Sequence, residues 1–356
     1  MTTTFVAAAV QAEPVWLDAD ASIDKAIALI SEAAAVGASL VAFPEVWIPG
    51  YPAWIWIGNP LWGAQFIRAY HENSIVVGDA RFERLRKAAA DNSISVVIGA
   101  SERAGGSIYM GQFLFDRDGQ VIATRRKLKP TGAERAVFGE GDGSDLVVRD
   151  VPGIGRLGAL NCWEHLQPLV KYAMYGMDEQ VHVAGWPNLA EPELVYALSH
   201  EANLRASQIY ALEGGCFVVA STTMLGEQGL DLFAQGDPEK IKLLCGGSRG
   251  YAQIFAPDGR PIGRTLSPEH EGLALAEIDL GMLPLAKSLL DPAGHYQRAD
   301  VLQLRLNTSP RRPVVPMNEI PQPAVDRPAD EERSDDGARP GTADLANHYS
   351  GTQSLG

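Results

Sequence analysis

Short apolar segments alternate with segments of helical periodicity along most of this chain, and the same alternation occurs twice. Apolar runs bounded by turn residues are typical of buried strands, and longer periodic segments are typical of helices that cover a sheet. The expected strands are residues 5–11, 39–43, 95–99, 108–115, 120–127, 156–161, 180–184, 216–221, 251–256 and 261–265. The expected helices are residues 23–35, 80–91, 164–176 and 194–213. This order predicts an α/β fold.

Each half of the chain also contains a hairpin signal, an Asp-Gly pair between two apolar runs. The two hairpin segments resemble each other, FDRDGQVIATR at 115–125 and FAPDGRPIGRT at 255–265. Two similar α/β halves, each with its own hairpin, predict a core of two sheets flanked by helices.

The last part of the chain differs in composition from the rest. Seven prolines, eight acidic residues and one aromatic residue occupy the 47 positions from Pro310 onward. Such a segment buries too little apolar surface to offset the entropy of ordering it. We therefore expect one folded domain over residues 1–306 and a disordered tail over 307–356.

Charge and cysteine content exclude several classes of protein. A net charge of −14 argues against a nucleic-acid or anionic membrane surface, and no apolar run is long enough to span a bilayer. The three cysteines have no C-x-x-C spacing, which fits neither a disulfide framework nor a zinc site. We expect a soluble cytoplasmic enzyme that has no metal.

Two glycine motifs invite a functional interpretation that their context excludes. Residues 153–158 match G-x-G-x-x-G, but a Pro-Gly turn precedes them and a strand follows, which is the wrong order for a dinucleotide site. Residues 246–250 match G-x-S-x-G, but they lead into a strand rather than a helix. We expect the second motif to be a connection between strands.

Cys162 lies where the strand 156–161 meets the expected helix. Exposed N–H groups and a helix dipole at that point would favour a thiolate, so Cys162 is the candidate nucleophile. Cys216 lies in an apolar run and is expected in the core, whereas Cys245 is undecided. His165 and, less strongly, Glu164 are neighbouring candidates for the base that would activate Cys162, although His165 better fits a role in fixing the helix start.

Two further polar residues follow predicted strands. Glu45 follows an apolar strand among aromatic residues and prolines, so burial should raise its pKa toward the range of a general base. The basic run at 125–129 contains Lys127 and Lys129, which strand alternation places on the same side as Arg125. Periodicity alone does not choose between the two lysines.

Taken together, these segments resemble the nitrilase superfamily, and within it the nitrilase branch. The matching stretches are FPEVWIPGYP (43–52), RRKLKPT (125–131) with Glu134-Arg135 following, ALNCWEH (159–165), GEGDGSD (139–145), VHVAGWP (181–187) and DPAGHY (291–296). The resemblance spans about residues 5–306 and keeps the motifs in order. It implies an α-β-β-α sandwich that pairs into α-β-β-α-α-β-β-α dimers and larger homo-oligomers or spirals.

The resemblance also assigns roles to residues. It implies that Cys162 is the nucleophile, Glu45 the general acid and base, Lys127 the cation and Glu134 a supporting carboxylate. One departure is Gly132-Ala133, which stands where the family usually has a histidine. That change leaves catalysis possible but could alter substrate range or subunit contacts.

The implied reaction is hydrolysis of a nitrile, with water, to a carboxylic acid and ammonia through a thioimidate and a thioester, without a cofactor. Candidate pocket walls are Tyr51, Trp163 and Trp186, which would suit an apolar substrate. The alternatives are an amidase or carbamoylase of the same superfamily, a cyanide dihydratase, and a non-enzymatic protein that forms filaments.

Overall fold

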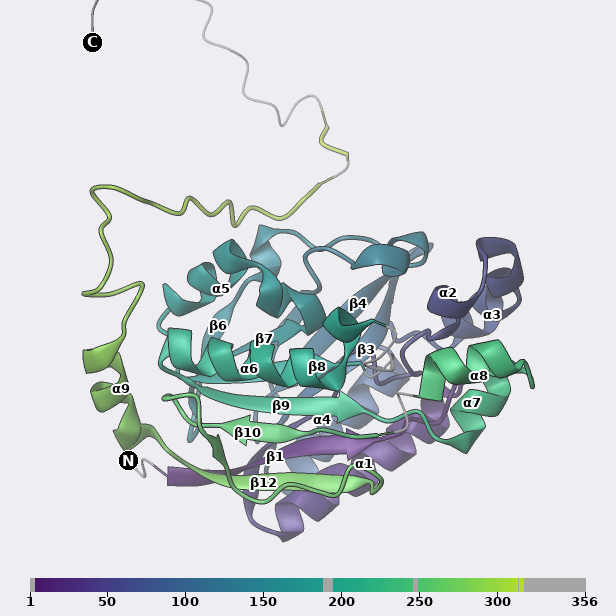
Figure 1. Ribbon diagram of the computed structural model, residues 1–356, viewed down its shortest axis with the longest axis horizontal. Coiled ribbons are helices and arrows are strands. Elements are labelled where there is room, and N and C mark those ends of the chain that lie inside the picture. Colours follow the sequence, from purple (N-terminus) through teal and green to yellow (C-terminus); the bar gives the residue numbers. More distant parts are fainter. Residues whose placement is uncertain (1–3, 188–194, 246–248, 313, 317–356) are drawn as a thin grey trace, which may run out of the picture. The chain divides into compact units, whose positions relative to one another are not determined.

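The computed structural model describes residues 4–187, 195–245, 249–312 and 314–316, and its strands and helices all lie in a unit that ends at Arg311 (Figure 1). The strands are β1 (Thr4–Ala12), β2 (Ala38–Ala42), β3 (Ser95–Ala104), β4 (Ser107–Phe115), β5 (Val121–Arg126), β6 (Val148–Val151), β7 (Gly155–Asn161), β8 (Val181–Trp186), β9 (Phe217–Thr223), β10 (Gln253–Phe255), β11 (Pro261–Ile262) and β12 (Gly272–Asp279). The helices are α1 (Ala19–Ala35), α2 (Trp54–Ile57), α3 (Pro60–Glu72), α4 (Ala80–Asn92), α5 (Pro168–Tyr175), α6 (His200–Gly214), α7 (Glu227–Ala234), α8 (Pro238–Leu244) and α9 (Leu283–Leu289).

The strands pair in the order β5-β4-β3-β2-β1-β9-β8-β7-β6, with β12 beside β1, β10 beside β9 and β11 beside β10. β1 joins the two halves, because it runs parallel to β2 and also pairs with β9 through Gln11 and Ala12. The rest of that edge of β1 pairs with β12. The halves are therefore bonded to each other at the carboxyl end of β1.

Three apolar clusters define four layers. The first packs α1 and α4 on the outer face of β1–β4, and it includes Val10, Ile23, Phe82 and Phe113. The second lies between the two halves of the sheet, and it includes Phe5, Leu40, Val97, Val183 and Val219. The third packs α5 and α6 on the other outer face, and it includes Leu160, Tyr175, Tyr210 and Val218. Side chains alternate along each strand, so Ala8 and Val10 face the helices while Ala7 and Ala9 face the opposite sheet. The predicted α-β-β-α sandwich is confirmed.

Element boundaries differ from expectation in the second half. The helix predicted over 164–176 begins only at Pro168, because residues 162–166 form a 3₁₀ turn first. The helix predicted over 194–213 begins at His200, where Ser199 caps it. The second hairpin is shorter than predicted, with β10 and β11 spanning three and two residues.

The glycine motif at 153–158 lies in the turn between antiparallel β6 and β7, where Val151 pairs with Gly155. A strand precedes this turn and a strand follows it, so the exclusion of a dinucleotide site, which needs a helix after the loop, is confirmed. For the motif at 246–250, residues 246–248 lie outside the described residues.

Within the described residues, no helix has the length and apolar character that crossing a membrane requires. Most of the predicted tail lies outside those residues, so the expected division into 1–306 and 307–356 stays a prediction.

Candidate active site

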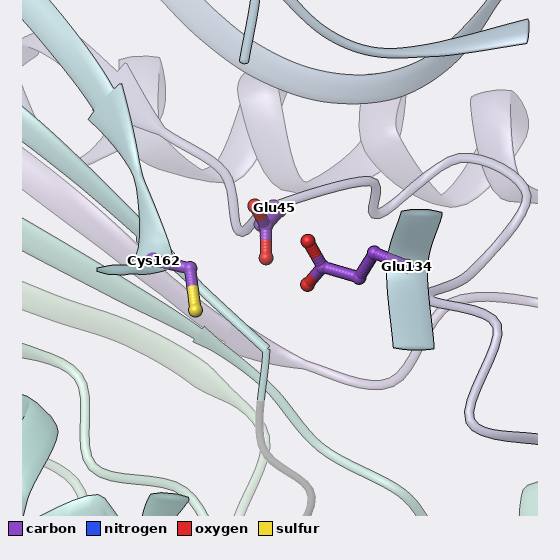
Figure 2. Close-up of side chains that lie close together, drawn as sticks. All are labelled: Glu45, Glu134 and Cys162. Carbon is purple, nitrogen blue, oxygen red and sulfur yellow. The ribbon is translucent and has the colours of Figure 1, made fainter. Parts of the chain in front are cut away.

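Three strand ends meet at one edge of the sandwich. Glu45 lies three residues after β2, Lys127 directly follows β5, and Cys162 directly follows β7. These strands run in the same direction, so their carboxyl ends lie together. Figure 2 shows the side chains of Glu45, Glu134 and Cys162 turned toward a common space. One ligand-type atom from each of these three lies within 4.8 Å of the others, and all three residues are buried.

Lys127 is the cation of this cluster. Its Nζ lies 2.9 Å from Glu45 Oε1 and 2.8 Å from Glu134 Oε2. Burial alone would lower the pKa of Lys127, but the two carboxylates outweigh it and hold that pKa above its usual value. Lys129 instead pairs with Glu140 at the surface. The structure thus separates the two lysines that strand alternation left equivalent.

Glu134 lies in a 3₁₀ turn, Gly132–Ala136, that carries it into the cluster. Its carboxylate accepts hydrogen bonds from the Tyr51 hydroxyl at 2.7 Å and from the Thr131 N–H at 2.6 Å. Gly132 has a φ of +52°, which glycine adopts without strain. A Cβ at this position would also lie 3.0 Å from the ring of Trp56. The departure at Gly132-Ala133 therefore lets the turn pass close to Trp56 while Glu134 keeps its place.

Cys162 has a different environment from the one predicted. The α-helix starts six residues later, so the expected helix dipole does not point at the thiol. Burial raises the pKa of Cys162 well above its usual value, although Lys127 opposes that effect. The prediction of a thiolate stabilised by the helix is wrong, because the helix begins too late and the raised pKa favours the thiol form. It needs a base within the cluster.

Glu45 fits that base. Burial raises the pKa of Glu45 to about 8, even though the ammonium of Lys127 pulls it down. A carboxyl group with a pKa in this range exchanges protons readily at neutral to mildly alkaline pH. The raised pKa expected for Glu45 from its buried, aromatic surroundings is confirmed in direction.

His165 is not available as a base. Its Nδ1 lies 2.6 Å from the Cys162 carbonyl oxygen and its Nε2 lies 2.9 Å from Nε2 of His182. Burial also lowers the pKa of His165 well below its usual value. Both ring nitrogens have partners, so the alternative Cys–His pair has no support in this geometry. His165 contacts the turn that carries the nucleophile, as its sequence position suggested.

Glu164 has a structural role instead of the catalytic one considered for it. It forms a bidentate pair with Arg125 at 2.8 and 3.0 Å. It also accepts hydrogen bonds from the N–H groups of Leu128 and Asn161, each at 2.8 Å. The buried pair therefore ties the end of β5 to the end of β7, and it sets the position of Lys127 relative to Cys162.

Sequence comparison connects this geometry to known proteins. The profile of the carbon–nitrogen hydrolase family matches residues 6–287. The chain belongs to that family. An aliphatic nitrilase from Rhodococcus rhodochrous is 52% identical over 86% of this chain and 80% of its own length. A bromoxynil-specific nitrilase from Klebsiella pneumoniae is 48% identical over 88% of both chains. An arylacetone-specific nitrilase from Alcaligenes faecalis is 42% identical over 90% of this chain and 91% of its own.

Solved structures of this family share the fold. A carbon–nitrogen hydrolase from Helicobacter pylori superimposes with a TM-score of 0.66 at 19% identity, covering 84% of this chain and 96% of its own. An amidase of the nitrilase superfamily from Nesterenkonia gives a TM-score of 0.61 at 20% identity, covering 83% and 96%. At such low identity these matches bear on the fold alone.

A small cavity in this carbon–nitrogen hydrolase opens onto the thiol. Two of the three expected pocket walls, Tyr51 and Trp163, line it together with Glu134 and Cys162. The sequence reading missed the other lining residues, which are Trp56, Thr131, Pro187, Leu198 and Asn203. The Trp163 Nε1 atom is buried and has no partner among the described residues.

Trp186, the third predicted wall, is not among the residues that line this cavity. It is fully buried, its ring stacks on His165 at 4.9 Å, and its Nε1 donates to Ser207 Oγ. Trp186 ends β8 on the face that packs against α6, which explains the difference. Through its contact with His165, Trp186 supports the turn that carries Cys162.

The donor set of Glu45, Glu134 and Cys162 is of a kind that could hold a metal ion. However, the ammonium of Lys127 already lies within 2.9 Å of both carboxylates. The cluster therefore has a built-in cation, and the absence of a metal and of a cofactor stays a prediction.

Removal of Glu164 should destabilise this enzyme. Arg125 would remain buried without its carboxylate, and breaking such a pair costs about 3–5 kcal/mol. We expect Glu164→Ala to lose about that much free energy of unfolding in urea titrations. Burial would raise the pKa of Glu164, but Arg125 outweighs it and lowers that pKa in the folded protein. The pair therefore stabilises the folded state at pH values above the pKa of Glu164 in the unfolded chain, and this stability is lost as the pH falls through the folded-state pKa. Glu140→Ala, which removes the surface carboxylate that pairs with Lys129 and Arg311, is the control and should leave the free energy of unfolding nearly unchanged.

Proposed function

We propose that this chain is a nitrilase, which converts a nitrile and two water molecules to a carboxylic acid and ammonia. The observation that carries the proposal is an ammonium ion, Lys127, held between two buried carboxylates beside a buried thiol. The names of relatives that are 42–52% identical favour a nitrile over an amide as the substrate.

In the first step, Glu45 takes the proton of the Cys162 thiol and the sulfur adds to the nitrile carbon. One π bond of the nitrile breaks as the carbon–sulfur bond forms, and the nitrogen receives the proton from Glu45. The product is a thioimidate. Lys127 and the Trp163 backbone N–H, which already hydrogen-bonds the Cys162 sulfur, would stabilise the developing negative charge.

In the second step, Glu45 removes a proton from water, which attacks the thioimidate carbon. The carbon–nitrogen bond then breaks, and ammonia leaves with the protons it has gained, so that a thioester remains. A second water attacks this thioester with help from Glu45. The carbon–sulfur bond breaks, the acid is released and the thiol regains its proton. Glu134 holds Lys127 and Tyr51 in place throughout.

The pH dependence should report the state of Glu45. Only its carboxylate can accept the thiol proton, and burial raises its pKa to about 8. We expect kcat/KM for an uncharged nitrile to rise with pH through an apparent pKa near that value, and to fall about tenfold per pH unit well below it. Initial rates of ammonia release between pH 5 and 10 measure this. An acid limb near the ordinary pKa of glutamate would contradict the role of Glu45.

A panel of nitriles assayed beside the corresponding amides tests the function itself. We expect ammonia from nitriles at rates well above those from amides, with aliphatic, aryl and arylaliphatic members compared because aromatic residues wall the cavity. Faster turnover of the amides would favour the amidase or carbamoylase alternative, and activity confined to cyanide would favour a cyanide dihydratase. Absence of any turnover, with equally slow alkylation of all three cysteines by iodoacetamide, would favour the non-enzymatic alternative.

We also propose that the protein works as a homodimer in the cytoplasm and assembles into larger homo-oligomers. Apolar side chains are exposed on and beside α5 and α6, the helices of one outer layer: Leu166, Leu169, Ile209 and Leu212. Exposed apolar side chains on these helices favour a protein interface, and sedimentation velocity would measure the assembly. The three free cysteines support a reducing compartment.

A further inference from the structure

Behind the candidate nucleophile lies a chain of buried polar residues that the reaction above does not use. The Tyr210 hydroxyl lies 2.6 Å from Glu179 Oε2, and Glu179 Oε1 lies 2.7 Å from His182 Nδ1. His182 Nε2 lies 2.9 Å from His165 Nε2, and His165 Nδ1 lies 2.6 Å from the Cys162 carbonyl oxygen. All four side chains are buried. An apolar layer at this position would need none of these groups.

The final acceptor determines the direction of every hydrogen bond. A carbonyl oxygen can only accept, so the proton of His165 is on Nδ1. In a neutral ring Nε2 then accepts, and His182 must donate to it from its own Nε2. His182 Nδ1 is left as an acceptor, which requires a proton on the facing oxygen of Glu179. Tyr210 donates to the other oxygen of that carboxyl group.

The surroundings favour this neutral arrangement over an ion pair. The nearby charged groups are Arg125 and Glu164, which pair with each other, and Lys287 near Glu179. Burial raises the pKa of Glu179 to about 8 and lowers that of both histidines. Gly158 leaves room for the Glu179 side chain, because a Cβ there would lie 2.0 Å from Glu179 Oε1.

The series of hydrogen bonds ends at Cys162, whose backbone conformation is unusual. Cys162 has a φ of 46°, in the left-handed region that residues with a side chain seldom adopt. Such a conformation persists only where the surroundings enforce it. The backbone angles of Cys162 set the direction of its thiol and of the Trp163 N–H, so a bond that fixes its carbonyl also fixes both groups.

We propose that Tyr210, Glu179, His182 and His165 form a neutral, one-directional chain of hydrogen bonds that positions the nucleophile by holding the Cys162 carbonyl. The inference rests on the proposed function, in which Cys162 attacks the substrate. The four residues are positioning residues, since none of them lines the cavity that opens onto the thiol.

Two substitutions of Glu179 test the proposal. Glutamine can donate to His182 and accept from Tyr210, so Glu179→Gln preserves the direction of the chain without a carboxyl group. We expect its kcat to stay within about threefold of the unmodified enzyme, whereas Glu179→Leu should lower kcat by about tenfold to 100-fold with little change in KM. Equal loss in both variants would overturn the neutral arrangement, and full activity in both would overturn the positioning role.

His165→Phe provides a second test if Glu179→Leu fails to fold. Phenylalanine keeps a ring against Trp186 but cannot donate to the Cys162 carbonyl. We expect a folded protein with a kcat reduced by about tenfold or more and a slower alkylation of Cys162 by iodoacetamide. Unchanged kcat and alkylation would overturn the proposal. Activity of the unmodified enzyme on the nitrile panel is measured in parallel, so that failure of the proposed function is recognised separately.

Discussion

Cys162→Ala should abolish ammonia release from every nitrile and leave a folded protein. Removal of a covalent nucleophile typically lowers turnover by at least about 10⁴-fold, because the covalent intermediate can no longer form. The thiol borders a cavity. We therefore expect a change of about 1 kcal/mol in the free energy of unfolding, measured by urea titration beside the ammonia assay.

The control is Cys245→Ala, at a partly exposed cysteine that follows α8, remote in the sequence from the catalytic strands. Its activity should match that of the unmodified enzyme. Mass spectrometry after treatment with a slow nitrile substrate should find the acyl or imidate adduct on the peptide that contains Cys162. Measurable turnover by purified Cys162→Ala would remove this cysteine as the nucleophile.

Lys127→Met should have the second largest effect, because it acts on catalysis and on stability together. Methionine keeps the length of the side chain but leaves Glu45 and Glu134 buried without their cation. Loss of a preorganised charge at the reacting atom lowers kcat by about 10³-fold or more. Leaving a buried carboxylate without its cation lowers the free energy of unfolding by about 3–5 kcal/mol, although Glu45 and Glu134 can reduce this loss by sharing a proton at low pH.

Lys129→Met is the matched control, two residues away on the same segment. Lys129 is half-exposed and its pair with Glu140 lies at the surface, so the variant should keep its activity and lose about 1 kcal/mol or less. Stability of Lys127→Met should improve as the pH is lowered, whereas that of Lys129→Met should follow the unmodified enzyme. An active Lys127→Met together with an inactive Lys129→Met would reverse the assignment.

Patterning predicted the central elements of the fold well because both faces of the inner strands are buried. β1 and β9 each contain a short continuous apolar run, FVAAAV and FVVA, which is typical of a strand buried on both faces. The strands β6 and β12 were not predicted. β6 has only four residues, two of them charged, and β12 contains two acidic residues, so neither is a continuous apolar run. The helices α2, α3 and α7 were also missed. They pack together through Trp54, Phe66 and Phe233, contacts that no local period reveals.

The active site depends on contacts between distant segments, which the local sequence does not reveal. The character of Cys162 was inferred from a helix that begins later than expected, because Pro168 starts a new helix after a 3₁₀ turn. Strand alternation places Lys127 and Lys129 on the same side, so it does not distinguish them. What distinguishes Lys127 is its contact with Glu45 and Glu134, which belong to other segments of the chain. His182 and Glu179 carried a signal, their spacing of three residues beside an apolar strand, but their link to Cys162 depends on how β7 and β8 pair.

The pairing of β1 with β12 has a consequence for how the protein is made. β1 leaves the ribosome before β12, and eight of its residues pair with β12. Until then, one edge of β1 presents unpaired N–H and C=O groups, which are a template for pairing with other chains. The nascent polypeptide therefore keeps this edge of β1 exposed until β12 has been translated, and during that time the edge can pair with other chains.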